Sequence, residues 1–172
     1  MTDPLEFLVS DADAVAVDGD VIDREMRELL IAQRGGQALG LFAAETDGII
    51  AWKDPSPLPG AFPAVLGLVC VRGRMYTVID PRSLAGGDGP GHEAPAGFIV
   101  LLAGEEQLGL AVERITSITE IFVDEIEPTG DGDVRSLIHG RWCDPIETVT
   151  IIDPARIFAA ACGEPETSER SK

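Results

Sequence analysis

Two five-residue segments of the chain are almost identical, Thr77–Pro81 (TVIDP) and Thr150–Pro154 (TIIDP), and they lie 73 positions apart. Two longer segments, Ile31–Ile50 and Val100–Thr119, also match, 69 positions apart, and each contains the triplet Leu-Gly-Leu. Each longer segment has apolar runs on both sides of a glycine with polar neighbours, which predicts a strand, a turn and a second strand. Both are followed later by an apolar strand that ends in Asp-Pro. The sequence therefore predicts a β-rich unit that occurs twice.

The repeated segments divide the chain into folded and connecting parts. They predict one folded region over 28–162, with halves at about 28–86 and 97–162. The Gly- and Pro-rich segment 86–97 between the halves has the composition of a flexible linker. The polar tail 163–172 has a composition typical of disorder.

The acidic N-terminal extension, residues 1–27, leaves two interpretations open where it meets the repeat. The segment Val21–Leu30, which spans the boundary, has apolar residues at helical spacing, which are Ile22, Met26, Leu29 and Leu30. The apolar run 29–31 equally suits the start of the first strand. We expect the boundary of the folded region near Glu28.

The net charge of −17, from 30 acidic and 13 basic residues, argues against nucleic-acid binding. Such binding gains much of its free energy from Lys and Arg side chains that neutralise phosphates. A surface of this charge also repels anionic lipid headgroups. No apolar run reaches the ~20 residues of a membrane span, and the N-terminus lacks the pattern of a signal peptide. We therefore expect a cytoplasmic protein that binds no nucleic acid and does not insert into a membrane.

The three cysteines, Cys70, Cys143 and Cys162, do not have the number or spacing of a disulfide framework, and we expect all three to be reduced. Cys70 lies in the apolar run LGLVCV, so we expect a small, buried side chain there. His139 and Cys143 stand four residues apart, as two metal ligands on a helix can. Gly140 between them favours a turn or strand instead, and the sequence offers no second pair of Cys or His ligands. We predict neither a metal site nor a cofactor.

The repeated aspartates, Asp80 and Asp153, have a catalytic and a structural interpretation. Equivalent carboxylates in two related halves can share a proton, as in aspartic proteases, which makes a pseudo-symmetric acid hydrolase the alternative function. Here each aspartate precedes a proline and a helix-compatible stretch, the pattern of a helix N-cap with proline at the first helical position. Arg82 and Arg156 follow closely enough to form ion pairs with them. We predict that both aspartates are caps. Since no other pairing of nucleophile and base stands out, we expect no enzyme activity.

The segment Val65–Gly86, VLGLVCVRGRMYTVIDPRSLAG, resembles the signature of CheW-type chemotaxis coupling proteins. That family carries a pattern like V-x-G-x-x-N-x-R-G-x-x-x-P-V-x-D-L, and the matching positions here include Gly67, Arg72, Gly73, Val78 and Asp80. Cys70 stands at the asparagine of the pattern and Thr77 at its proline. The segments GGQALGL and GEEQLGLAVERITSITEI resemble the hairpins of the two halves of the family, so the resemblance covers about Glu28 to Ala161.

The resemblance implies an all-β fold of two tandem, five-stranded SH3-like barrels with short helical segments at the ends. It also implies a non-catalytic adaptor. Such a protein bridges the regulatory domain of a CheA-type histidine kinase and the cytoplasmic tip helices of chemoreceptors, in chemotaxis or a related two-component system. The residues assigned to partner binding are Thr46, Asp47, Ile49, Val71, Arg72 and Gly73 in the first half, and Ile115 and Ile118 in the second. The two second-half isoleucines would complete an apolar groove for a receptor helix, although each also suits a core position.

Arg72 lies in an otherwise apolar strand of a chain with few cations. A guanidinium group can donate several hydrogen bonds in a fixed geometry to a partner. It can equally pair within the chain, with Asp80 or Asp47, and shape the turn. Both interpretations stay open, and they are compatible with each other.

The two tryptophans, Trp52 and Trp142, stand beside a loop in each half. We expect each to pack against its own barrel rather than to serve as an exposed anchor for a partner. A barrel that binds a small molecule in its interior is a third candidate function. Barrels this small are filled by their own side chains, which disfavours it.

Overall fold

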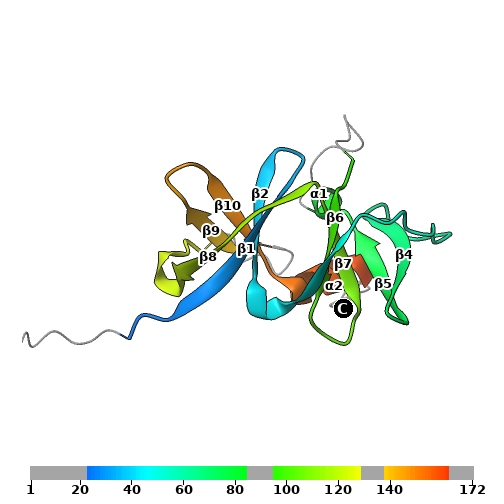
Figure 1. Ribbon diagram of the computed structural model, residues 1–172, viewed down its shortest axis with the longest axis horizontal. Helices are drawn as coiled ribbons and strands as arrows, with labels where there is room; N and C mark the ends of the chain where they lie inside the picture. Colours follow the sequence, from blue (N-terminus) through cyan, green and yellow to red (C-terminus); the bar gives the residue numbers. More distant parts are fainter. Residues whose placement is uncertain (1–22, 85–94, 129–137, 163–172) are drawn as a thin grey trace, which may run out of the picture.

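The computed structural model describes residues 23–84, 95–128 and 138–162, which are largely strands (Figure 1). The first half of the chain forms β1 (Met26–Arg34), β2 (Gln37–Phe42), β3 (Thr46–Ala51), β4 (Val65–Val71) and β5 (Arg74–Ile79). The second half forms β6 (Phe98–Leu102), β7 (Leu108–Val112), β8 (Arg114–Phe122), β9 (Ile138–Cys143) and β10 (Thr148–Ile152). The helical segments are η2 (Ala43–Glu45), η3 (Val123–Glu125), α1 (Pro81–Leu84) and α2 (Pro154–Cys162). Within the described ranges, no helix has the length and apolarity to cross a membrane. The predicted extension up to residue 22, the tail 163–172 and most of the predicted linker lie outside the described residues.

The ten strands form two five-stranded sheets. The first sheet has the order β8-β1-β2-β10-β9 and the second the order β3-β6-β7-β5-β4; Figure 1 shows them on its left and right. Replacing each strand of the first sheet by the strand five places later in the chain, counted cyclically, gives the second sheet. The duplication predicted from the sequence is therefore present in the topology. The all-β fold with two five-stranded units is confirmed, although no ladder among the described strands closes either sheet into a barrel.

Each sheet takes strands from both halves of the chain, which corrects the predicted division into one half before and one half after the linker at 86–97. The first sheet joins β1 and β2 to β8, β9 and β10, while the second joins β3, β4 and β5 to β6 and β7. The repeated segments pair with each other where strands of the two halves meet in a sheet. Thr150 of TIIDP pairs with Leu39 of the first copy, and Thr77 of TVIDP pairs with Leu108 of the second, both in parallel ladders. The two nearly identical segments thus have equivalent places, since each pairs with the Leu-Gly-Leu strand of the other copy.

The glycine of each triplet allows close packing against a neighbouring strand. A Cβ atom on Gly109 would lie 2.7 Å from Cγ2 of Ile99. A Cβ atom on Gly40 would lie 3.0 Å from Cγ1 of Val149. Both separations are shorter than ordinary van der Waals contact between carbon atoms. A side chain at position 109 would therefore force the adjacent β6 to shift, and one at position 40 would require Val149 to move slightly.

The helical interpretation of the segment before the repeat is wrong for its described residues, since Met26, Leu29 and Leu30 lie in β1. This strand pairs with β2 on one side and with β8 on the other. All of Leu29–Ala32 is buried, because β1 is an interior strand that is covered on both faces here. A continuous apolar run lacks the alternation of a half-exposed strand, and for this reason its spacing also fitted a helix.

One hydrophobic cluster joins the two sheets. Its members include Leu30 and Leu41 from the first sheet, Val100 and Leu110 from the second, and Ile157 from α2. Each sheet also has a smaller cluster of its own. Trp142 packs against the cluster of the first sheet and Trp52 against that of the second, as predicted. The shared cluster makes the two sheets one cooperative unit.

We predict that the fragments 1–88 and 89–172 fold only when both are present, because neither contains all the strands of either sheet. Co-expressed, they should co-purify as a one-to-one complex with the circular dichroism spectrum of the intact chain. Each fragment alone should give no cooperative thermal unfolding transition. A single fragment that unfolds cooperatively as a monomer would contradict the exchange of strands between the halves.

Candidate functional site

The two repeated aspartates cap helices, as predicted. The backbone N–H of Arg82 donates to Oδ1 of Asp80 at 3.1 Å, and that of Ala155 donates to Oδ1 of Asp153 at 3.0 Å. In both cases the proline after the aspartate is the first residue of the helix. The proline lacks an N–H that would otherwise have no acceptor there, so the Asp-Pro pair is a complete start signal for each helix.

Asp80 also forms a buried ion-pair network between the two sheets. Arg34, at the end of β1, donates to its carboxylate from Nη2 at 2.8 Å and from Nε at 3.3 Å. Arg82 donates from Nη2 at 2.7 Å. The side chains of Arg34 and Asp80 are only 6% and 7% exposed. Burial alone raises the pKa of Asp80, but the hydrogen bonds from Arg82 and Arg34 outweigh it and lower the pKa to about 2.

Asp153 has a different environment, which removes the support for an acid hydrolase. Its carboxylate lies 3.3 Å from Nε of Arg156, and its side chain is 27% exposed. A catalytic dyad requires two carboxylates that share one proton. Asp80 is held ionised by two guanidinium groups, and no hydrogen bond joins these two described aspartates. The alternative function is therefore not supported.

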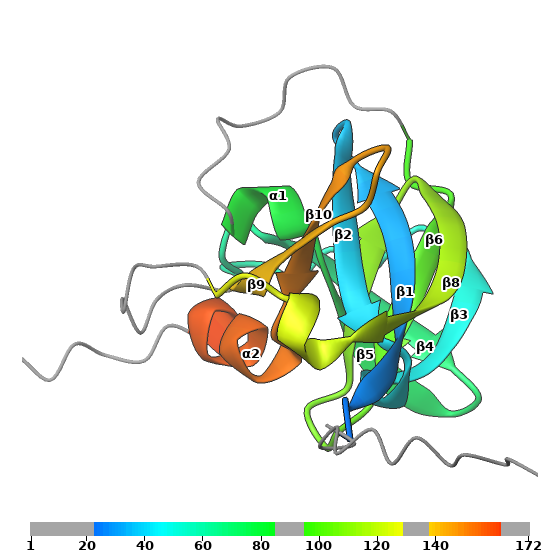
Figure 2. The same cartoon turned by 90° about the vertical axis from the view of Figure 1, so that its left-hand side faces the viewer.

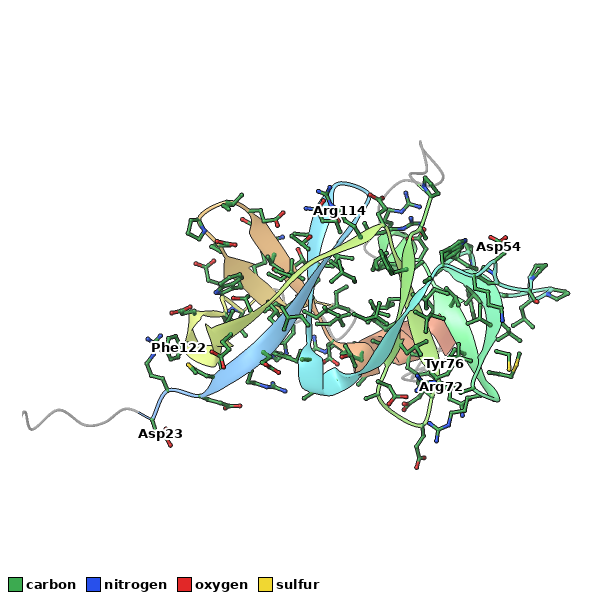
Figure 3. All side chains as sticks on the ribbon, in the orientation of Figure 1. Asp23, Asp54, Arg72, Tyr76, Arg114 and Phe122 are labelled. Carbon is green, nitrogen blue, oxygen red and sulfur yellow. The ribbon has the colours of Figure 1, made fainter. Side chains whose placement is uncertain are left out.

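Arg72 and Gly73 form the two-residue turn between β4 and β5. Both have positive φ angles, 49° and 80°, as a type I′ hairpin turn requires at its two central positions. Arg72 is exposed (Figure 3). The predicted internal partners are engaged elsewhere: Asp80 by Arg34 and Arg82, and Asp47 by the hydroxyl of Tyr76, which donates at 3.2 Å. Within the described part of the chain, the Arg72 guanidinium forms no ion pair.

The turn borders a cavity of about 240 Å³, which we call the Arg72 cavity. Its lining residues are Asp47, Gly48, Ile49, Ile50, Val71, Arg72, Arg74, Tyr76 and Leu101. The structure thus brings together four of the predicted residues from β3 and the β4–β5 hairpin, with Gly73 in the same turn. Sequence analysis missed Arg74 and Tyr76. The period-two alternation of β5 was an available signal, since it places these two residues on one face of the strand.

Besides Gly73, three predicted residues do not line this cavity. Thr46 donates its hydroxyl to the carbonyl of Ala43 at 2.8 Å and so closes η2. Ile115 packs against the cluster shared by the two sheets. Ile118 lies on β8, an edge strand of the first sheet, and is 60% exposed. Its counterpart in the repeat is Ile49 on β3, an edge strand of the second sheet, which is 41% exposed. Figure 2 shows both edge strands on the same side of the molecule.

The prediction that Cys70 is buried is wrong. Cys70 is exposed on β4, as is its counterpart Cys143 on β9. Both strands are outer edges of their sheets, and alternation buries Val69 while it turns Cys70 outward. His139 packs edge-on against Phe42, with ring centroids 5.9 Å apart. Among the described residues, no group of three or more His, Cys, Asp or Glu side chains is placed to hold a metal ion.

Comparisons with known proteins agree with the resemblance in the sequence. The family model described as CheW-like domain matches residues 28–162. The crystal structure of the scaffolding protein TtCheW from Thermoanaerobacter tengcongensis is similar, with a TM-score of 0.66 and 17% sequence identity. That match covers 76% of this chain and 86% of the other, and at this identity it shows the fold alone. No curated protein matches the sequence.

The ion pairs of Asp80 should make stability depend on pH in the acid range. Its folded-state pKa of about 2 lies below the ordinary value of 3.8, so the unfolded chain binds the proton first as the pH falls. The contribution to stability is therefore complete above about pH 4 and is lost as the pH falls through about 2. Urea unfolding between pH 7 and pH 2 should show this loss in the wild type, and Asp80→Asn should lack this contribution.

At pH 7, Asp80→Asn should lower the free energy of unfolding by about 3–5 kcal/mol, because it removes a carboxylate that is paired with the buried guanidinium group of Arg34. The matched control is Asp153→Asn, which alters the equivalent cap at a more exposed ion pair. This change should cost only about 0.5–2 kcal/mol. Equal losses from the two substitutions would show that the ion pairs between the sheets add nothing to the cap.

Proposed function

Since the chain belongs to the CheW-like domain family, we propose that it is a non-catalytic adaptor between chemoreceptors and a CheA-type histidine kinase. It works in the cytoplasm, in chemotaxis or a related two-component system, and it needs no cofactor. One partner is the regulatory domain of the kinase, and the other is the bundle of helices at the cytoplasmic tip of a receptor. The adaptor acts through its surfaces, which hold the two partners at a fixed distance and orientation.

The conformation of Arg72 is the observation that carries this proposal. Its φ of 49° places a long side chain in the left-handed region, which costs a residue other than glycine about 1–2 kcal/mol. Asparagine or glycine would form the same turn with less strain. The turn therefore carries an arginine at the expense of stability, and the exposed guanidinium forms no ion pair with any described residue. Strain of this kind at an exposed position supports a contact with a partner.

The Arg72 cavity has the chemistry of a protein contact. Its two arginines, Arg72 and Arg74, lie beside apolar side chains from three strands, in a chain whose net charge is −17. An exposed guanidinium next to an apolar surface can bind a carboxylate and a neighbouring aliphatic group together. We assign this surface, with Thr46, Asp47, Ile49, Val71 and Gly73, to the kinase domain.

The edge strands β3 and β8 offer a second surface, for the receptor. Ile49 and Ile118 are exposed at equivalent positions of the two strands, and the partly buried Ile115 lies three positions before Ile118 in the same strand. An amphipathic helix binds to such a surface through apolar residues on one of its faces. In this assignment Ile49 belongs to both surfaces, so the receptor and the kinase would bind to adjacent parts of the adaptor.

The turn is tested by Arg72→Asn. This change removes the guanidinium and creates an Asn-Gly pair, the preferred sequence for this turn. The variant should be more stable by about 1 kcal/mol and should bind the immobilised kinase regulatory domain at least about tenfold more weakly. Both quantities are measured on the same preparation, by urea unfolding and by biolayer interferometry. Lys53→Ala, which removes an exposed cation outside the cavity, should bind as the wild type does. Wild-type affinity in Arg72→Asn would refute the proposed kinase contact.

The receptor surface is tested by Ile118→Asp, which places a charge on the exposed face of β8. Binding to a receptor-tip fragment should weaken by about tenfold or more, because the helix would have to bury the carboxylate, while binding to the kinase domain should not change. The control is Ile146→Asp, on the turn between β9 and β10, where the isoleucine is 89% exposed. If both variants bind the receptor fragment equally well, β8 is not part of the receptor surface.

A further inference from the structure

The duplicated fold forms two cavities at equivalent places, one beside each Asp-Pro junction. One cavity, of about 200 Å³, is lined by Leu39 of β2 and Pro81 of α1, among others. The other, of about 220 Å³, is lined by Leu108 of β7 and Pro154 of α2, their counterparts in the repeat. We call the first the arginine cavity and the second the acidic cavity, after the side chains described next. Neither shares a residue with the Arg72 cavity.

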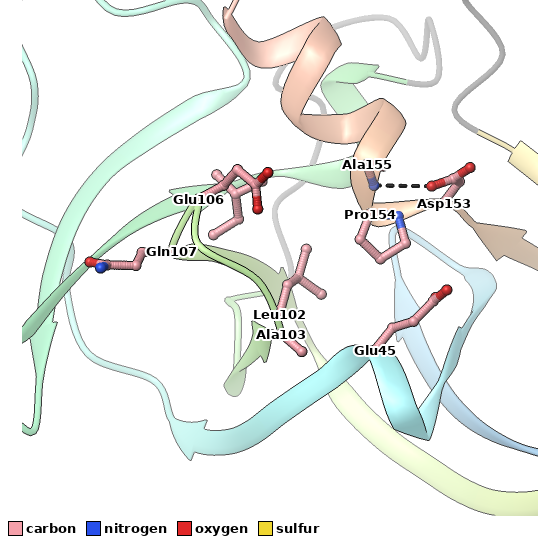
Figure 4. A pocket seen from close by; sticks show the side chains of 9 residues that line it. Glu45, Leu102, Ala103, Glu106, Gln107, Asp153, Pro154 and Ala155 are labelled. Carbon is pink, nitrogen blue, oxygen red and sulfur yellow. Dashed lines mark hydrogen bonds between the residues drawn. The ribbon is translucent and has the colours of Figure 1, made fainter.

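The two cavities carry opposite charge. Figure 4 shows the acidic cavity, where Glu45, Glu106 and Asp153 are drawn among the lining side chains. The arginine cavity is instead lined by Arg34, Arg82 and Arg141. The same backbone arrangement therefore has acidic side chains in one cavity and guanidinium groups in the other.

The acidic cavity shows that the fold does not require arginines at this place. The counterparts of Arg34 and Arg82 in the repeat are Ala103 and Ala155, and both line the acidic cavity. Burying a guanidinium is costly, and an apolar replacement is often as stable or more stable. A cavity at this junction forms without a guanidinium group among its described lining residues, so the architecture alone does not explain why Arg141 lines the other cavity.

The arginine cavity combines its charges with an apolar lining. Ile152 of β10 and Ile157 of α2 lie among its walls and are almost fully buried, and Leu39 adds a third aliphatic side chain. Arg34 and Arg82 both donate to Asp80. Arg141 on β9 is exposed, and no carboxylate of the described residues forms an ion pair with its side chain. A small, largely apolar pocket with a few convergent polar groups is the usual form of a small-molecule site.

We propose that the arginine cavity binds a small aliphatic carboxylate. Arg141 pairs with the carboxylate group of the ligand, and the aliphatic part lies against Leu39, Ile152 and Ile157. A planar guanidinium group matches both carboxylate and phosphate oxygens. The aliphatic wall selects between them, because inorganic phosphate would place polar oxygens against apolar side chains without hydrogen bonds. This site is separate from the adaptor surfaces and does not rest on the proposed function.

The test is isothermal titration calorimetry on the full chain, with isobutyrate and inorganic phosphate as probes at constant ionic strength in sodium chloride. Isobutyrate should bind saturably to one site, and more tightly than phosphate. Arg141→Ala should weaken isobutyrate binding by about tenfold or more, as expected for a charge-assisted hydrogen bond. The control is Arg114→Ala, which removes an exposed arginine of β8 outside the cavity and should leave the affinity unchanged.

Three results would overturn the proposal: no saturable binding of isobutyrate, equal affinity in the wild type and Arg141→Ala, or tighter binding of phosphate than of isobutyrate. The thermal unfolding midpoint of Arg141→Ala without ligand checks that the variant is folded. A second measurement uses the wild type alone. Isobutyrate should shift the methyl resonances of Ile152 and Ile157 in nuclear magnetic resonance spectra but not those of Ile49. Shifts confined to residues outside the cavity would also count against the site.

Discussion

The parallel pairing of each Asp-Pro strand with the Leu-Gly-Leu strand of the other copy is the contact on which the rest of the structure depends. It joins Thr77 to Leu108 in the second sheet and Thr150 to Leu39 in the first. Because of this pairing, each sheet contains strands from both halves of the chain. Each Asp-Pro pair follows the last residue of a strand in one sheet and lies beside a hairpin of the other sheet. The ion pair of Asp80 with Arg34 and the two equivalent cavities are consequences of that placement.

The two halves of the chain share one backbone topology, and they differ in the side chains that form ion pairs and line cavities. Asp80 pairs with the buried Arg34 of the β1–β2 hairpin, which belongs to the other sheet. The position equivalent to Arg34 in the second copy is Ala103. The β4–β5 turn is the strained pair Arg72–Gly73, whereas the β9–β10 turn is the longer acidic segment 144–147. The shared topology provides stability through the hydrophobic cluster between the sheets. The two sites for which binding is proposed, at Arg72 and in the arginine cavity, are places where the two copies differ.

Local patterns in the sequence were enough to predict much of this structure. The repeat, the glycine-centred hairpins and the Asp-Pro caps at Asp80 and Asp153 depend on neighbours within a few residues, and all of these predictions are confirmed. Local patterns could not predict which strands pair with each other. TVIDP has the same apolar pattern as TIIDP, so nothing in either segment says which Leu-Gly-Leu triplet it joins. The burial of Leu29 and Leu30 in an interior strand, and the exposure of Cys70 on an edge strand, follow from that choice and were missed with it. The Arg72 cavity was found in part, because the resemblance to the CheW-type signature points to the turn but not to Leu101 on a distant strand.

Cross-strand nuclear Overhauser effects between backbone protons test the exchange of strands most directly. The account predicts contacts from Thr77 to Leu108 and from Thr150 to Leu39, with none from Thr77 to Leu39. Contacts that instead link Thr77 with Leu39, and Thr150 with Leu108, would mean that each half folds by itself and would contradict the account.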